Sequence, residues 1–121
     1  MLKKRIGVIM YQTSKSKGQE LVAQRMTREF NQRGHQAYLI TSVYNDGVKI
    51  IAPENLREMD GYIYAEDSEF GIPIIRVDSY IARWPPRRII FRDFIATLGK
   101  IVEKFQLDVL ITHSTLWNGP E

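Results

Sequence analysis

The feature that most constrains the fold is a strand–helix–strand pattern at the start of the chain. Residues 6–11 form a short, almost wholly apolar run, which is typical of a strand buried on both faces. Residues 19–33 follow a helical period, Gly34 suits the end of that helix, and residues 37–41 predict a second strand. Because the connections are short, we predict a βαβ unit with two parallel strands and a right-handed crossover.

The predicted helix has one apolar face. Val22, Met26 and Phe30 are spaced by four residues, and Ala23 widens the stripe that they form. Polar side chains fall outside this stripe, among them Gln24, Arg25, Arg28 and Gln32. We therefore expect the apolar stripe to pack against the sheet and the polar side chains to face away from it.

The middle of the chain is less regular. The sequence predicts a hairpin with the turn Asn45-Asp46-Gly47, a short helix and two strands, at residues 41–51, 53–59, 62–64 and 72–77. After Pro85-Pro86, apolar residues spaced by three and four from Phe91 to Phe105 predict a long helix. Residues 108–113 then form another strand of the buried type.

This order of elements predicts an α/β fold with a doubly wound, mainly parallel sheet, in one domain spanning residues 1–121. Hydrophobic residues make up 44% of the chain and charged residues 26%, which is typical of a globular protein and excludes a disordered tail. The absence of cysteine excludes disulfide scaffolds, thiolate zinc sites and cysteine nucleophiles, and it fits a cytoplasmic location. The net charge of +3 is too small to indicate a nucleic-acid partner.

The sequence stops at Glu121, shortly after a predicted buried strand. A doubly wound sheet normally has a covering helix at this point. We therefore expect the chain to be a piece of a longer protein. A sheet edge left uncovered there could pair with a second copy, which would give a homodimer.

The first candidate site is the polar segment 12–18, between the first predicted strand and the helix. In open α/β sheets ligands bind at the carboxyl ends of strands, and the start of a helix favours anions. Ser16, Lys17 and Gly18 are therefore candidates for binding a phosphate or a sugar, with Gly18 allowing the backbone to approach closely. A solvated surface loop is the alternative. The chain contains no GxGxxG and no P-loop pattern, which argues against a dinucleotide or Walker-type site.

The second candidate site is the end of the last predicted strand, where His113 is followed by Ser114. His113 is a titratable group at the place where ligand clefts form, and the alternative is a histidine satisfied by a neighbouring carbonyl. His35 opens the second strand at the opposite end of the sheet, and we interpret it as structural. Two histidines placed in this way do not predict a metal site.

A basic run surrounds the break at Pro85-Pro86. It contains Arg83, Arg87, Arg88 and Arg92, with Trp84 among them, and the first three are the candidate contacts. Such a run could contact anionic lipid headgroups at the inner face of a membrane, or a phosphorylated acceptor. We favour the simpler interpretation of a solvated entry to the following helix, because the arginines are few.

Several of these motifs resemble the N-terminal half of family 4 glycosyltransferases, which have the two-domain GT-B architecture. Gly18-Gln19-Glu20 is similar to the family's turn at the start of the first helix, and Arg33-Gly34-His35 is similar to the end of that helix. Residues 71–77 look like a strand that these proteins carry between the end of the first helix and the strand with the two histidines. Residues 108–114 resemble the family's Asp-Val-(apolar)-His-Ala-His-Ser strand, with His113 on the second histidine.

The resemblance implies the Rossmann-like, acceptor-side half of an enzyme that transfers a sugar from a nucleotide-sugar donor, with retention of configuration and without a metal. It implies that an absent C-terminal half binds most of the donor, that no cofactor is needed, and that this chain alone is inactive. His113 would act as the catalytic residue near the transferred sugar, while Ser16, Lys17, Gly18 and Ser114 would contact substrate or phosphate. The acceptor would be a sugar, a lipid or another small molecule.

Two other classes of function stay open. A flavodoxin-like domain could hold the phosphate of FMN in the segment 12–18, although that segment lacks the Thr-Gly-Asn-Thr run of such proteins. A non-catalytic binding or assembly module is the second alternative, and a native gene ending at Glu121 would favour it.

Overall fold

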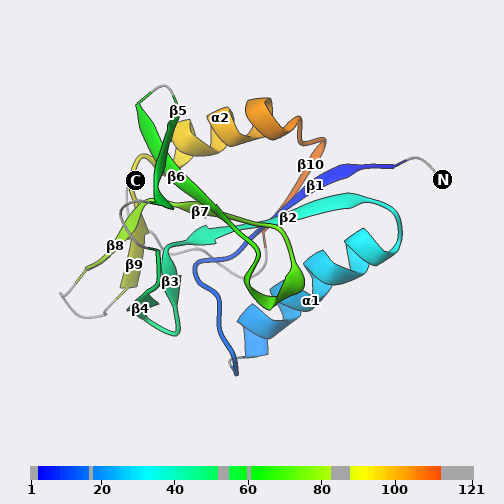
Figure 1. Ribbon diagram of the computed structural model, residues 1–121, viewed down its shortest axis with the longest axis horizontal. Coiled ribbons are helices and arrows are strands. Elements are labelled where there is room, and N and C mark those ends of the chain that lie inside the picture. Colours follow the sequence, from blue (N-terminus) through cyan, green and yellow to red (C-terminus); the bar gives the residue numbers. More distant parts are fainter. Residues whose placement is uncertain (1–2, 17, 52–54, 60, 83–87, 113–121) are drawn as a thin grey trace.

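The computed structural model describes residues 3–16, 18–51, 55–59, 61–82 and 88–112. In Figure 1 a central sheet lies between two helices, with one helix on each of its faces. The helices are α1 (Gly18–Gln32) and α2 (Phe94–Phe105). The described residues thus form a small α/β domain, in which a helix covers each face of the sheet.

The sheet has six strands. In chain order they are β1 (Arg5–Ile9), β2 (Gln36–Ser42), β5 (Arg57–Met59), β6 (Tyr62–Asp67), β7 (Ile74–Val77) and β10 (Val109–Thr112). Their order across the sheet is β10-β1-β2-β7-β6-β5. β1 is parallel to both β2 and β10, and β2 is parallel to β7. β6 is antiparallel to its neighbours β5 and β7, so the sheet is mixed.

Three smaller elements lie beside the sheet. β3 (Tyr44–Asn45) and β4 (Val48–Lys49) form an antiparallel hairpin. Its turn residues Asp46 and Gly47 have φ angles of 50° and 79°, as a type I′ turn requires. β8 (Ser79–Ala82) and β9 (Arg88–Phe91) form a second antiparallel pair. A 3₁₀ turn, η2 (Glu69–Gly71), connects β6 to β7.

Alternate residues of the parallel strands face opposite helices, which gives two hydrophobic clusters. On the α1 side the cluster includes Ile6, Val8, Ala23, Leu39 and Ile74. On the α2 side it includes Ile9, Ile40, Ile75, Val77, Phe94, Ile101 and Phe105. Because both faces of the strands are buried, the strands read as the continuous apolar runs seen in the sequence.

The structure confirms the predicted βαβ unit. β1 and β2 are parallel, and α1 begins one residue before the predicted start and ends one residue before the predicted end. The hairpin with its turn at Asp46 is also present, although its strands have only two residues each. The predicted strands at 62–64, 72–77 and 108–113 are found as β6, β7 and β10.

Two expectations are wrong, and a third is met in part. The sheet predicted to be mainly parallel is mixed: β10, β1, β2 and β7 pair in parallel, whereas β6 and β5 add to the sheet in the antiparallel direction. The short helix expected at 53–59 is not found at its described end, where Arg57–Met59 forms β5 and pairs with β6. The long helix begins at Phe94 rather than after the prolines. Arg88–Phe91 instead forms β9, because three consecutive apolar residues pair with β8 and fill the core.

The buried side of α1 also differs from the expected apolar stripe. Its buried residues are Glu20, Ala23, Gln24 and Thr27, while Val22 is 41% exposed. Gln24, expected outside the stripe, is 4% exposed. The first turns of α1 face the polar segment that follows β1, so polar side chains are buried there through hydrogen bonds.

Gly7 lies in β1, between β10 and β2, where the ends of neighbouring side chains leave little room for a Cβ atom. A Cβ atom on Gly7 would lie 2.8 Å from Ile40 Cδ1, 2.9 Å from Leu110 Cδ2 and 3.0 Å from Leu107 Cδ1. We therefore expect Gly7→Ala to lower the free energy of unfolding by about 1–3 kcal/mol. Urea denaturation followed by circular dichroism measures this change.

Gly99 in α2 provides the matched control. A Cβ atom there meets no other atom within 4 Å, so Gly99→Ala should raise the free energy of unfolding by about 0.5–1 kcal/mol through helix propensity. Changes of the same sign in both variants would contradict the close packing around Gly7.

Candidate functional site

The carboxyl ends of β1 and β10 lie side by side. The two strands are parallel neighbours, and Ile9 is the register partner of Thr112. β2 and β7 lie on one side of β1 and β10 on the other, so the strand order reverses at β1. Ligands of open α/β sheets bind at the carboxyl ends of strands next to such a reversal. We call this edge the carboxyl rim.

The segment that leaves β1 at the carboxyl rim is held in place by the β3–β4 hairpin. Residues 10–16, the β1 loop, run beside Tyr44–Asp46 through a parallel bridge between Thr13 and Asn45. The backbone N–H of Thr13 donates to the carbonyl of Tyr44 at 3.2 Å, and that of Asp46 donates to the carbonyl of Thr13 at 3.0 Å. The loop is therefore an ordered extension of β1 rather than a solvated connection.

Three successive backbone N–H groups of the β1 loop have acceptors within the protein. Ser14 N donates to Gln24 Oε1 at 2.9 Å, Lys15 N to Asp46 Oδ2 at 3.2 Å, and Ser16 N to Ser14 Oγ at 3.1 Å. The Ser14 hydroxyl donates to the other carboxylate oxygen of Asp46. The Asp46 carboxylate thus occupies the position at the loop that a bound anion would take.

A buried carboxylate lies under the loop. Glu20, in the first turn of α1, is 2% exposed, and its Oε2 accepts from Gln12 Nε2 at 2.9 Å. Gln12 Oε1 in turn accepts from Gly47 N at 2.9 Å, which joins the hairpin to the helix. Burial raises the pKa of the Tyr11 phenol, and the charge of Glu20 and a hydrogen bond to it add to this increase. The helix start favours the negative charge of Glu20.

The guanidinium of Arg76 connects the β1 loop to the sheet. Arg76 is fully buried in β7, and its Nε donates to Asp67 Oδ2 at 2.8 Å. Its Nη1 donates to the carbonyl of Ser42 at 2.9 Å and to that of Tyr44 at 3.3 Å. Its Nη2 donates to Thr13 Oγ1 at 3.2 Å. A buried cation with this set of acceptors fixes the ends of β2 and β6, the hairpin and the loop relative to one another.

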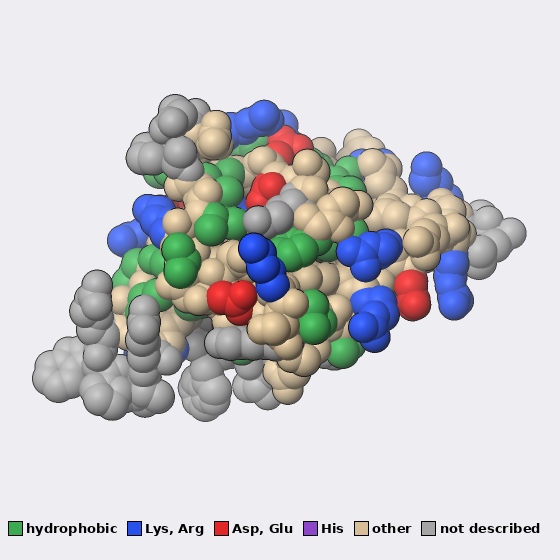
Figure 2. Space-filling model, turned by 60° about the horizontal axis from the view of Figure 1, so that its bottom comes forward, with side chains coloured by type: hydrophobic (Ala, Val, Ile, Leu, Met, Phe, Trp, Pro, Cys, Tyr) green, Lys and Arg blue, Asp and Glu red, His purple; other side chains and the backbone are tan. Residues whose placement is uncertain are grey.

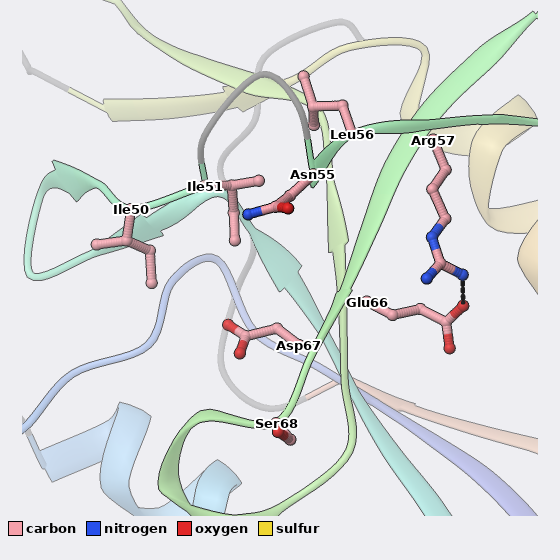
Figure 3. Close-up of a pocket in the computed structure, with 8 residues that line it drawn as sticks. All are labelled: Ile50, Ile51, Asn55, Leu56, Arg57, Glu66, Asp67 and Ser68. Atoms are coloured by element: carbon pink, nitrogen blue, oxygen red, sulfur yellow. Dashed lines mark hydrogen bonds and ion pairs between the residues drawn. The ribbon is translucent and has the colours of Figure 1, made fainter.

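A hollow of about 610 Å³ lies beside Asp67, between β4, β5 and β6. Figure 3 shows Arg57 and Glu66 pointing toward each other, and their Nη1 and Oε2 atoms are 2.7 Å apart. Asp67, which also lines the hollow, pairs with Arg76. Both carboxylates of this hollow therefore have arginine partners, while Ile50, Ile51 and Leu56 supply its apolar wall.

The predicted site residues fall partly within the described chain. Ser16 is exposed at the end of the β1 loop, and Gly18 is exposed at the first position of α1. Arg88 lies in β9 and is half-buried. The remaining predicted site residues, Lys17, Arg83, Arg87, His113 and Ser114, lie outside the described residues.

The structure agrees with the structural role expected for His35. Its Nδ1 accepts from Lys4 N at 3.0 Å, and its ring packs edge-on against Phe30 with 6.1 Å between ring centroids. It precedes β2 at the end of the sheet opposite the carboxyl rim. Among the described residues, no three His, Asp or Glu side chains lie close enough together to hold a metal ion. No described helix is long and apolar enough to cross a bilayer.

Sequence reasoning missed the residues that order the site. Gln12, Glu20 and Gln24 were not expected to be buried together, and Asp46 was recognised only as a turn residue. Only Arg76 could have been found from the sequence, because an arginine inside the apolar run Ile74–Val77 indicates a buried charge that needs buried partners.

Comparisons with protein-family models, curated proteins and solved structures give no significant match to this chain. The geometry of the carboxyl rim and of the β1 loop is therefore what bears on function. In that geometry the carboxyl end of β1 lies next to that of β10, and an ordered, partly exposed loop leads from β1 to the start of α1.

The Tyr11 phenol makes stability depend on pH in the alkaline range. Because its pKa in the folded protein is raised above 10.0, the unfolded chain releases this proton first as the pH increases. The stabilisation is complete below about pH 10 and is lost as the pH rises through the folded pKa. Urea denaturation between about pH 8 and pH 11 should show a steeper loss of stability in the wild type than in Tyr11→Phe. If the free energy of unfolding fell equally with pH in the wild type and in Tyr11→Phe, the raised pKa of Tyr11 would be contradicted.

Removal of the Arg76 guanidinium should destabilise the whole domain. We expect Arg76→Met to lower the free energy of unfolding by about 3–5 kcal/mol, because its buried acceptors lose their donor. Arg92→Met is the matched control, since the Arg92–Asp78 ion pair is 3.4 Å long and the Arg92 side chain is 55% exposed. Its loss should cost less than about 1 kcal/mol. If urea denaturation gave equal losses of stability for Arg76→Met and Arg92→Met, the hydrogen bonds of Arg76 would not be what holds the loop.

Proposed function

We propose that this chain is the acceptor-side half of a retaining glycosyltransferase of the GT-B type, which moves a sugar from a nucleotide-sugar donor to a small acceptor. The observation that carries the proposal is the parallel pairing of β1 with β10. It brings the carboxyl ends of β1 and β10, at Ile9 and Thr112, to the same rim of the sheet. The order β7-β2-β1-β10, with a helix on each face, supports a doubly wound, Rossmann-like half.

The motifs that resemble family 4 glycosyltransferases lie at the junctions around β1. Gly18-Gln19-Glu20 opens α1 directly after the β1 loop. Arg33-Gly34-His35 forms the turn between α1 and β2, where Gly34 has a φ of 93° that only glycine adopts readily. Asp108 precedes β10, and its Oδ2 accepts from Arg5 N at 2.9 Å, which fixes the start of β10 to β1.

The chemistry of the proposal needs positive charge and hydrogen-bond donors where a nucleoside diphosphate departs. The amides of Ser14, Lys15 and Ser16 already have acceptors, so we assign the contact with the diphosphate to the Ser16 side chain, to Lys17 and to the exposed Gly18 at the start of α1. His113 would approach the transferred sugar from the end of β10, with Ser114 beside it. Most of the donor would be bound by a second domain.

The same amides bear on the flavodoxin-like alternative. An FMN phosphate in such a domain is cradled by backbone N–H groups of the first loop. Here Lys15 N donates to the Asp46 carboxylate, and Ser14 N donates to Gln24. A flavin phosphate would have to displace both acceptors, which makes this alternative the weaker one. A preparation with flavin absorbance would restore it.

The proposal is tested on the protein that carries both halves. Release of nucleoside diphosphate from UDP- and GDP-sugars, in the presence of candidate acceptors, measures transfer. We expect His113→Ala to lower kcat/KM by about 100-fold or more, with the free energy of unfolding changed by less than about 1 kcal/mol. Gly18→Ala should lower transfer without loss of stability, because a Cβ atom at Gly18 meets nothing within 4 Å. Gly99→Ala is the control and should leave transfer unchanged.

Three outcomes would contradict the proposal. Equal loss of rate and stability in His113→Ala would identify a core histidine instead of a catalytic one. Transfer catalysed by residues 1–121 alone would show that this chain is not merely an acceptor-side half. Absence of turnover with every nucleotide sugar would favour a non-catalytic binding module.

A further inference from the structure

A basic groove lies on the outer side of α1, between that helix, the β1 loop and η2. Its volume is about 350 Å³, which falls in the usual range for small-molecule sites. Three cationic side chains line it, Lys15 from the loop and Arg25 and Arg28 from α1, and no acidic side chain is among its described lining residues. Figure 2 shows Lys and Arg side chains gathered on the α1 side of this face.

Within the described ranges, no Asp or Glu oxygen forms an ion pair with Lys15, Arg25 or Arg28. The Asp46 carboxylate approaches the edge of the groove, but there it accepts from the backbone of Lys15. Like charges brought together without counter-charges repel one another and create a positive potential inside the groove.

The Arg28 guanidinium is held in position. Its Nη2 donates to the carbonyl of Phe70 at 2.9 Å, which leaves the other N–H groups of the fork for a ligand. Phe70 has a φ of 64°, an uncommon value for a non-glycine residue, and this conformation presents its carbonyl to α1. The fork at the groove is thus ordered before any ligand binds, which lowers the entropy lost on binding.

The floor of the groove combines apolar surface with one buried polar group. Leu21 and Phe70 are half-buried and supply the apolar part. Gln24 is 4% exposed, and its Oε1 accepts from Ser14 N. The Gln24 side chain thus fixes the floor of the groove to the β1 loop.

We propose that this groove binds a phosphoryl group carried on an apolar body. Two guanidinium forks and an ammonium group suit the three terminal oxygens of a phosphate monoester better than the two of a carboxylate. Leu21 and Phe70 would contact the apolar part. Neither Ser16 nor Gly18, the described residues assigned to the diphosphate, lines the groove, so this inference does not depend on sugar transfer. The phosphate could belong to a soluble phosphate ester or to a lipid headgroup.

Titration with phenyl phosphate, followed by isothermal calorimetry, tests the soluble source. We expect saturable binding that weakens as salt is raised, and weaker binding of methyl phosphate, which lacks the apolar part. Flotation with phosphatidylcholine vesicles, with and without phosphatidic acid, tests the lipid source. In either arm, Arg25→Gln combined with Arg28→Gln should weaken binding by about tenfold or more.

Arg33→Gln is the matched control, because Arg33 is exposed at the other end of α1 and does not line the groove. It should change binding by less than about twofold. Arg25 and Arg28 are also exposed, so the double variant should retain its melting temperature, which confirms that it is folded. Binding of phenyl phosphate identifies a soluble ester as the source, and binding only to phosphatidic acid vesicles identifies a lipid. Failure of both probes to bind, or an equal loss in Arg33→Gln, would overturn the proposal.

Discussion

One buried guanidinium organises the end of the molecule where the loops lie. Arg76 has no access to solvent, and it reaches the Asp67 carboxylate, the carbonyls of Ser42 and Tyr44, and the Thr13 hydroxyl at the same time. A buried cation that loses its acceptors is strongly unfavourable, so these partners have to be in place together. The register of β6 on β7 is therefore coupled to the position of the hairpin and, through the hairpin, to the β1 loop.

The parts of the fold that could be predicted are those with a local signal. The βαβ unit followed from two apolar runs, a helical period and Gly34, and β10 followed from the run at 109–112. β9 could not be separated from α2 in the sequence. Phe91 ends β9 and Phe94 begins α2, but their spacing of three residues continues the helical pattern of apolar residues. The centroids of the two rings are 4.8 Å apart across the junction between the elements, where Asp93 has a φ of 47°. β5 depends on its pairing with β6, which no local pattern encodes.

The candidate site was predictable in its place but not in its chemistry. Its position at the end of β1 followed from the general behaviour of α/β sheets. The acceptors of its amides, however, come from Asp46 and Gln24, which are 31 and 10 residues away in the chain from the groups that they bind. Such contacts depend on tertiary structure alone. Gln24 in particular reads as a solvent-facing residue of an amphipathic helix, and only the ordered β1 loop above it makes its burial favourable.

β10 is the least supported of the parallel strands of the sheet. Among the described strands it is bonded only to β1, and Val109 and Leu110 are 38% and 41% exposed. The bond from Arg5 N to Asp108 spans 103 residues, so docking β10 closes the longest loop in the described chain. Few contacts and a large closure entropy place a strand at the low end of local stability. Hydrogen exchange should therefore be fastest there among the parallel strands, so that one wall of the carboxyl rim opens more readily than the wall formed by β1.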